Sequence, residues 1–207
     1  MFSEIFLSVM LAALMTFVGT RWIERLYRTS KDLTFPDEIL SRSRYRRPIL
    51  FCMLTALNFY VLSTTIAPEK FFLLAANFFL VLMTVTDFEQ YMLFDAMTIP
   101  FATIGAIRVW QLSLNVHDHA LAAIIGGGIF LLLAIISSGS LGGGDVKLIA
   151  ALGLWLGCEK LLSVVLIGTV GGGLAAVLLI LTKKKSRNSY FAYGPYFALS
   201  ALYTLLI

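Results

Sequence analysis

The chain has 207 residues, of which 59% are hydrophobic and only 14% are charged, and its net charge is +4 at neutral pH. Soluble domains are about half apolar and a quarter charged, so this composition argues against a water-soluble protein. The excess of basic residues does not indicate a nucleic-acid partner, because in membrane proteins such residues usually mark the cytoplasmic side.

Long apolar blocks predict an all-α membrane bundle of about eight transmembrane helices in a single domain, residues 1–207. A helix needs about 20 apolar residues to cross a bilayer, and the blocks lack the alternation of barrel strands. In chain order, helices are expected at about residues 5–22, 49–66, 71–86, 96–114, 119–137, 145–156, 160–182 and 190–206. A basic loop at about residues 23–48 separates the first two helices.

Lysine and arginine residues are distributed unevenly along this expected topology. Eight of them lie between Arg21 and Arg47, and with alternating helices thirteen of the sixteen fall on one side. The asymmetry predicts that this loop is cytoplasmic and that both chain ends lie on the opposite side. The same arrangement places Asp87, Asp95 and Asp145 together at the cytoplasmic edge.

Few ionisable residues border the apolar blocks, and such residues are candidates for function. Asp87 ends the third expected helix, Glu89 follows it, Asp95 precedes the fourth and Asp145 begins the sixth. Each has an ordinary explanation when taken alone: helix N-capping for Asp95 and Asp145, and a solvated loop for Asp87 and Glu89. Two converging carboxylates, however, can share one proton and act as acid and base. Asp87 and Asp145 are therefore the predicted catalytic pair.

Three consecutive glycines, Gly142, Gly143 and Gly144, come directly before Asp145. Without β-carbons they would let an extended peptide approach closely, and they can adopt positive φ angles, although they could equally serve only to turn the chain. Helix ends bias the charge of the pair. We expect Asp145, at a helix start, to be mainly ionised and Asp87, at a helix end, to be mainly protonated.

The same residues resemble a known family. Residues 142–148, Gly-Gly-Gly-Asp-Val-Lys-Leu, closely resemble the G-x-G-D-V-K-L motif of the bacterial type IV prepilin peptidases. Residues 87–95 resemble the family's other acidic motif, and residues 193–199 resemble its last-helix segment. The resemblance implies an eight-helix aspartic protease without a cofactor or metal, in which Asp87 and Asp145 are catalytic.

The resemblance also implies partners and a location. The substrates would be prepilins or pseudopilins, whose short basic leader is cut at the cytoplasmic face of the bacterial inner membrane. Further residues are expected to form or border the substrate-binding loops, namely Gly142, Gly143, Gly144, Lys147, Glu89 and Asp95.

Two features depart from the family pattern. Phe94 stands where proline is usual, and residues 23–48 contain none of the four cysteines that many bacterial members carry in this loop. Because those members also methylate the new N-terminus, we expect a peptidase without methyltransferase activity. Two alternatives stay open: a small transporter, which would usually place its acids near the bilayer midplane, and a non-catalytic pilus-assembly protein.

Overall fold

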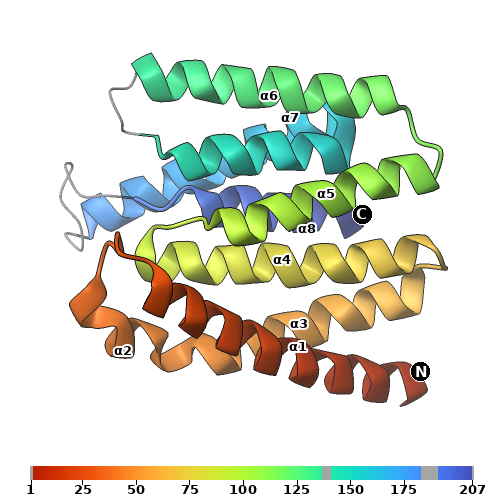
Figure 1. Cartoon of the computed structure of the whole chain (residues 1–207), viewed down its shortest axis with the longest axis horizontal. Coiled ribbons are helices and arrows are strands. Elements are labelled where there is room, and N and C mark those ends of the chain that lie inside the picture. The colour runs from red at the N-terminus through yellow and green to blue at the C-terminus, as the bar shows by residue number, and fades with distance from the viewer. Residues whose placement is uncertain (1, 137–140, 183–190, 207) are drawn as a thin grey trace.

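A computed structural model describes residues 2–136, 141–182 and 191–206, and all regular structure within these ranges is helical. Figure 1 shows the long helices lying side by side, with both chain termini at the same end of the bundle. The long helices are α1 (Phe2–Thr29), α3 (Arg46–Thr64), α4 (Glu69–Gln90), α5 (Asp95–Gln111), α6 (Val116–Ile136), α7 (Gly143–Leu181) and α8 (Gly194–Leu206). Three single turns connect α1 to α3, namely η1 (Pro36–Glu38), α2 (Ile39–Arg42) and η2 (Ser43–Tyr45).

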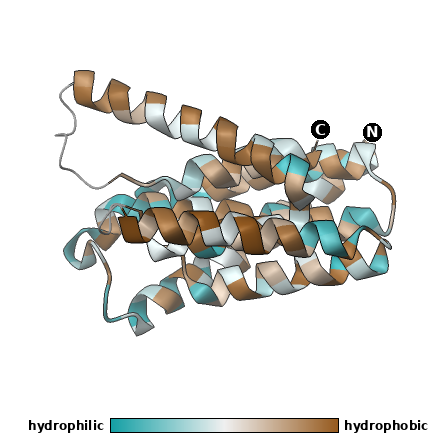
Figure 2. Ribbon diagram, turned by 90° about the horizontal axis from the view of Figure 1, so that it is seen from above, coloured by the Kyte–Doolittle hydropathy of each residue, from teal (hydrophilic) through white to brown (hydrophobic). Residues whose placement is uncertain are grey.

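The helices have the length and surface of membrane spans. Within the described ranges, five segments are long and apolar enough to cross a bilayer: α1, α4, α6, α7 and the stretch Pro36–Thr64 that contains α3. Many large hydrophobic side chains are exposed, and hydrophilic residues gather toward the helix ends (Figure 2). The predicted all-helical membrane architecture is thus confirmed. The predicted count of about eight spans is not confirmed, since the described residues contain seven long helices.

The count is lower by one at α7, where the expected sixth and seventh helices follow one another directly on either side of a break at Gly157. At Gly157 the backbone of α7 has φ 74° and ψ 178°, a conformation suited to glycine. The α7 ribbon turns back on itself along its course (Figure 1). Neighbouring side chains satisfy the groups freed by this break. Arg108 donates to the carbonyl of Trp155 (3.0 Å), and the Asp118 carboxylate accepts from the amide of Cys158 (3.2 Å). The break thus lies one residue before the turn expected at residues 158–159.

The polar segments contain more helix than the sequence predicted. The loop expected at residues 23–48 is partly helical, because α1 continues to Thr29 and three turns follow. Likewise α4 continues past Asp87 to Gln90, and it ends at Tyr91 in the left-handed conformation (φ 54°). Glu89 is thus a helix residue and not a loop residue. The helix continues because Glu89 pairs with Arg46 of α3 and Gln90 with Phe35 of the segment between α1 and α3, so neither needs solvent.

The centre of the fold is α4. Every residue from Phe79 to Asp87 is buried, and the helix packs against α1, α3, α5 and α8. Because lipid-facing helices surround it, the end of α4 is held from several sides. That end carries Asp87.

Candidate active site

Asp87 and Asp145 line the same cleft, which has a volume of about 230 Å³. One wall is the end of α4 and the turn after it, with Asp87, Tyr91, Met92 and Leu93. The other wall is the start of α7, residues 142–145. The structure therefore brings together two carboxylates that are 58 positions apart in the sequence (87 and 145).

Asp87 is held against the start of α8. Its side chain is buried, with the residue 5% exposed, and the backbone amide of Gly194 interacts with its carboxylate. A β-carbon built on Gly194 would lie only 2.6 Å from Asp87 Oδ2, so alanine does not fit there without a shift. This Oδ2 has no hydrogen-bond partner among the described residues. Buried polar atoms are rarely left unpaired, and a carboxylate oxygen in this condition beside a cleft is a candidate for catalysis.

Asp145 lies in the first turn of α7. Its amide donates to the carbonyl of Gly142 (3.0 Å), and the Gly142 amide interacts in turn with the Asp145 carboxylate. Gly142 itself has an extended backbone (φ −70°, ψ 141°) that other residues also adopt. The fold thus presents Asp145 at the positive end of a helix, where a carboxylate is stabilised.

The three glycines before Asp145 differ in how tightly they are packed. A β-carbon on Gly144 would lie 3.0 Å from that of Leu93, one on Gly142 would lie 3.4 Å from Asp145 Oδ2, and one on Gly143 would meet nothing within 4 Å. None of the three has a positive φ, so the structure does not use the backbone freedom that glycine allows here. What they provide is a wall without side chains.

The two carboxylates belong to opposite walls of one small cleft. Two like charges in a largely desolvated cleft repel each other, so a single negative charge shared between them is favoured over two. Such a pair titrates as a unit. A pair of carboxylates of this kind can supply a general base and a general acid, which hydrolysis of an amide requires.

Lys147 and Asp95 form an ion pair with each other outside the residues that line this cleft. Lys147 Nζ lies 2.7 Å from Asp95 Oδ1, and both side chains are about half exposed (56% and 53%). An exposed pair of this kind contributes about 0–1 kcal/mol. Its contribution here is to link the start of α7 to the start of α5.

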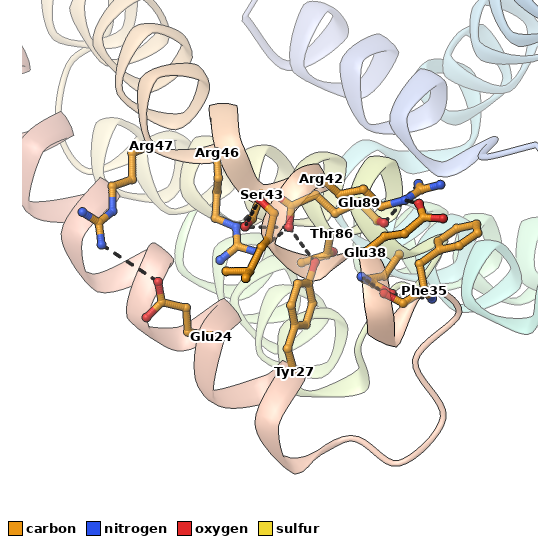
Figure 3. Close-up of polar contacts among 12 residues, drawn as sticks. Glu24, Tyr27, Phe35, Glu38, Arg42, Ser43, Arg46, Arg47, Thr86 and Glu89 are labelled. Atoms are coloured by element: carbon orange, nitrogen blue, oxygen red, sulfur yellow. Dashed lines mark hydrogen bonds and ion pairs between the residues drawn. The ribbon is translucent and has the colours of Figure 1, made fainter. Parts of the chain in front are cut away.

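Glu89 is also outside the cleft lining and belongs to a buried cluster (Figure 3). Arg46 of α3 forms an ion pair with its carboxylate, with Arg46 Nη2 2.6 Å from Glu89 Oε2. The hydroxyl of Tyr27 donates to the same oxygen (2.9 Å). Removing one partner of a buried ion pair leaves the other charge buried and unpaired, which lowers the free energy of unfolding by about 3–5 kcal/mol. The cluster therefore ties α1 and α3 to the last turn of α4, two residues beyond Asp87.

A second contact holds the turn after α4. The backbone of Phe35 exchanges two hydrogen bonds with the Gln90 side chain (2.8 and 3.1 Å). The Phe35 ring meets Tyr91 edge-on, with 5.1 Å between ring centroids, and the Arg42 guanidinium covers its other face at 3.5 Å. The segment before α3 thus supports the wall of the cleft that Tyr91 forms.

Sequence reasoning missed the residues that shape the cleft without carrying charge. These are Tyr91, Met92, Leu93 and Gly194. Gly194 lies in the stretch 193–199 that resembles the family's last helix, and that resemblance was the available signal. In the part of the chain that the structure describes, no three His, Cys, Asp or Glu residues are grouped to hold a metal ion.

Comparison with known proteins gives one family. The model of the type IV leader peptidase family matches residues 72–177, just over half of the chain. The prepilin leader peptidase/N-methyltransferase of Escherichia coli (strain K12) is 28% identical over 168 residues, which cover 76% of this chain and 72% of that protein. The proteins of the same name from Aeromonas hydrophila and Neisseria gonorrhoeae are 29% and 32% identical over 162 and 125 residues. These matches cover 74% and 56% of this chain, but only 56% and 42% of those proteins. The chain thus spans about half the length of several relatives, and no solved structure matches it.

Proposed function

The chain belongs to the type IV leader peptidase family, and on that premise we propose that it is a membrane aspartic endopeptidase acting on prepilins or pseudopilins. It would remove their short basic leader. The observation that carries the proposal is the cleft that Asp87 and Asp145 line together, bounded by three glycines. The long apolar helices support a position in the membrane, where a substrate with a hydrophobic helix can reach the cleft.

In the proposed mechanism Asp145 starts ionised and Asp87 starts protonated, since Asp145 lies in the first turn of α7 and Asp87 in the last turn of α4. Asp145 removes a proton from water while the water oxygen attacks the scissile carbonyl carbon, and Asp87 gives its proton to the carbonyl oxygen. Asp145 then protonates the amide nitrogen, and Asp87 takes back a proton from the tetrahedral intermediate as the C–N bond breaks. Both carboxyl groups end in their starting states.

We place the cleft at the cytoplasmic face of a bacterial inner membrane. The supporting observation is the distribution of basic residues, thirteen of sixteen on the side that bears Asp87 and Asp145 in the alternating topology. The same end of the bundle carries Arg42, Arg46 and Arg47 in and before α3. A leader cut at this face would never need to cross the membrane.

We further propose that the chain acts as a peptidase alone, although the printed names of the relatives include N-methyltransferase. Residues 23–48 contain no cysteine, so thiolates cannot hold a tetrahedral zinc ion in this segment. The test is incubation with prepilin and S-adenosylmethionine, followed by mass spectrometry of the mature N-terminus. A methylated N-terminus would contradict the proposal.

The peptidase itself is tested by co-expression with each prepilin encoded in the same genome, with leader removal read from the mass of the pilin. Asp87→Asn and Asp145→Asn should each abolish cleavage while the protein remains inserted. Asp95→Asn is the matched control, because its carboxylate pairs with Lys147 outside the cleft lining. Cleavage at near the wild-type rate by either cleft variant would exclude the aspartic mechanism. No cleavage of any prepilin by the unaltered chain would favour a non-catalytic assembly role.

A further inference from the structure

A second hollow lies between α1 and α3, away from the catalytic cleft. It has a volume of about 660 Å³, and its polar lining consists of Thr16, Thr20, Arg21, Glu24 and Arg47. The catalytic cleft is built from α4 and α7 instead, so the two sites share no lining residue.

The hollow follows one face of α1 and opens toward the membrane. The positions that α1 contributes between Ala13 and Glu24 are spaced three or four apart, with Arg21 beside them, so they form one stripe. This stripe is about 16 Å long at 1.5 Å per residue. Phe17 within it is 55% exposed, and Arg47 at its end is exposed as well. The opening is therefore on the outer surface of the bundle, where lipid lies.

Two hydroxyl groups in the hollow are buried without a partner among the described residues, those of Thr16 and Thr20. A threonine in a helix usually donates back to the carbonyl four residues earlier. Thr55 and Thr64 in α3 do this at 2.7 Å each. Thr20 is only 4% exposed, so water does not readily hydrogen-bond to its hydroxyl. Both threonines line the hollow, so a change of side-chain rotamer would bring either hydroxyl to an acceptor there.

Positive charge gathers at the end of the hollow nearest the polar edge of the bundle. The Arg21 guanidinium lies over the Phe17 ring, 4.2 Å from its centroid. Arg47 reaches Glu24 only at 4.0 Å, and the two side chains are 77% and 41% exposed (Figure 3). Such a long, exposed pair contributes little, so Arg47 can engage another anion. Two guanidinium groups against one carboxylate leave a net positive charge.

We propose that this hollow binds an anionic phospholipid. The phosphate lies between Arg21 and Arg47, the glycerol ester oxygens accept from Thr20 and Thr16, and an acyl chain runs along Ala13 and Phe17. Along α1 the charged residues lie at one end of the hollow and Ala13 at the other, with the two threonines and Phe17 between them, so the hollow changes from polar to apolar as a lipid does from headgroup to tail. Basic pockets between membrane helices recognise anionic headgroups in this way. A soluble phosphate would leave the apolar half of the hollow unused.

The test uses the purified full chain in detergent, with bound lipid counted by native mass spectrometry. Phosphatidylglycerol should be retained in preference to phosphatidylcholine. Arg21→Gln and Arg47→Gln should each weaken this retention about fivefold, as expected for one basic residue at a charged headgroup. Arg25→Gln is the matched control, since it removes the same charge from the same helix but does not line the hollow. Equal retention of both lipids, or an equal loss in Arg25→Gln, would overturn the proposal.

A second variant separates lipid binding from a structural effect. Thr20→Val keeps the shape and removes the hydroxyl, so it should leave the melting temperature without lipid unchanged or higher. It should also reduce the additional stabilisation that phosphatidylglycerol provides. If Thr20→Val leaves the lipid-dependent stabilisation intact, the hydroxyl does not contact the lipid and the assignment fails. Inorganic phosphate at millimolar concentration should not stabilise the protein, and stabilisation equal to that by phosphatidylglycerol would reassign the site to a free anion.

Discussion

Gly194→Ala is expected to reduce peptidase activity by one to two orders of magnitude while the protein stays folded. Gly194 begins α8 and lies directly against Asp87, so its missing side chain leaves the space that the carboxylate occupies. Alanine is a better helix former than glycine, and α8 itself would tolerate it. The damage should therefore fall on the catalytic pair.

The magnitude follows from the contact distances. A β-carbon at position 194 would lie 2.6 Å from Asp87 Oδ2 and 3.2 Å from Leu93 Cδ1, whereas ordinary van der Waals contact begins at about 3.4 Å. The carboxylate oxygen must then retreat by about 0.8 Å. Misplacement of a reacting group by about 1 Å can cost about 100-fold in rate. Because the displaced group acts on the transition state, kcat should fall more than KM rises.

The assay is cleavage of a purified prepilin in proteoliposomes, with kcat and KM measured separately and the melting temperature recorded for each variant. Gly173→Ala is the matched control, because it adds a β-carbon within α7 that meets no atom within 4 Å. Gly143→Ala tests the cleft wall, where an added β-carbon touches only what enters the cleft, so it should act mainly through KM. A Gly194→Ala enzyme with wild-type kcat would show that Asp87 does not act from the position seen here.

Three further predictions concern the cluster, the charges and the topology. Glu89→Gln should lower the free energy of unfolding by about 3–5 kcal/mol in a denaturant titration, because it leaves the buried charge of Arg46 unpaired. A variant that replaces both residues with apolar ones should regain part of this loss. No regain would mean that the two residues are not coupled. In infrared difference spectra near neutral pH, the protonated-carboxyl band should vanish in Asp87→Asn and persist in Asp145→Asn; the reverse pattern would exchange their roles. A reporter fused after Ile207 should lie on the opposite side of the membrane from one inserted between α1 and α3, and a cytoplasmic reporter at that end would contradict the proposed orientation.

The membrane architecture and the family could be predicted from the sequence because both depend on local information. A block of about 20 apolar residues is stable in lipid whatever its neighbours are, so composition alone indicated membrane helices. The motif at residues 142–148 is continuous in sequence, and the family match confirms the resemblance it carried. The count of about eight helices is not confirmed in the same way, because α7 is broken only at Gly157, next to the turn expected at residues 158–159. The break at Gly157 lies inside an apolar stretch, and its freed backbone groups are satisfied by Arg108 and Asp118 from other helices.

The fate of individual acids could not be predicted because their partners are distant in sequence. Glu89 was a candidate for the substrate-binding loops, but its carboxylate pairs with Arg46, 43 positions earlier. Asp95 pairs with Lys147 across 52 positions. A carboxylate looks the same in a sequence whether it faces a substrate, a solvent or an arginine. Only the packing of α3 against α4 and of α5 against α7 distinguishes these cases.

The segment between α1 and α3 illustrates how residues without chemistry can determine a site. It was expected to be a basic loop, yet its Phe35 exchanges hydrogen bonds with Gln90, and its Arg42 donates to the carbonyl of Glu89, so it contacts the two residues that end α4. On the opposite side Gly194 limits where the Asp87 carboxylate can lie. Asp87 thus belongs to a helix end that is fixed both by the chain before it and by the chain after it. Because an acid and a base must face the same reacting atoms, fixing the helix end on both sides is a precondition for any chemistry that the pair performs.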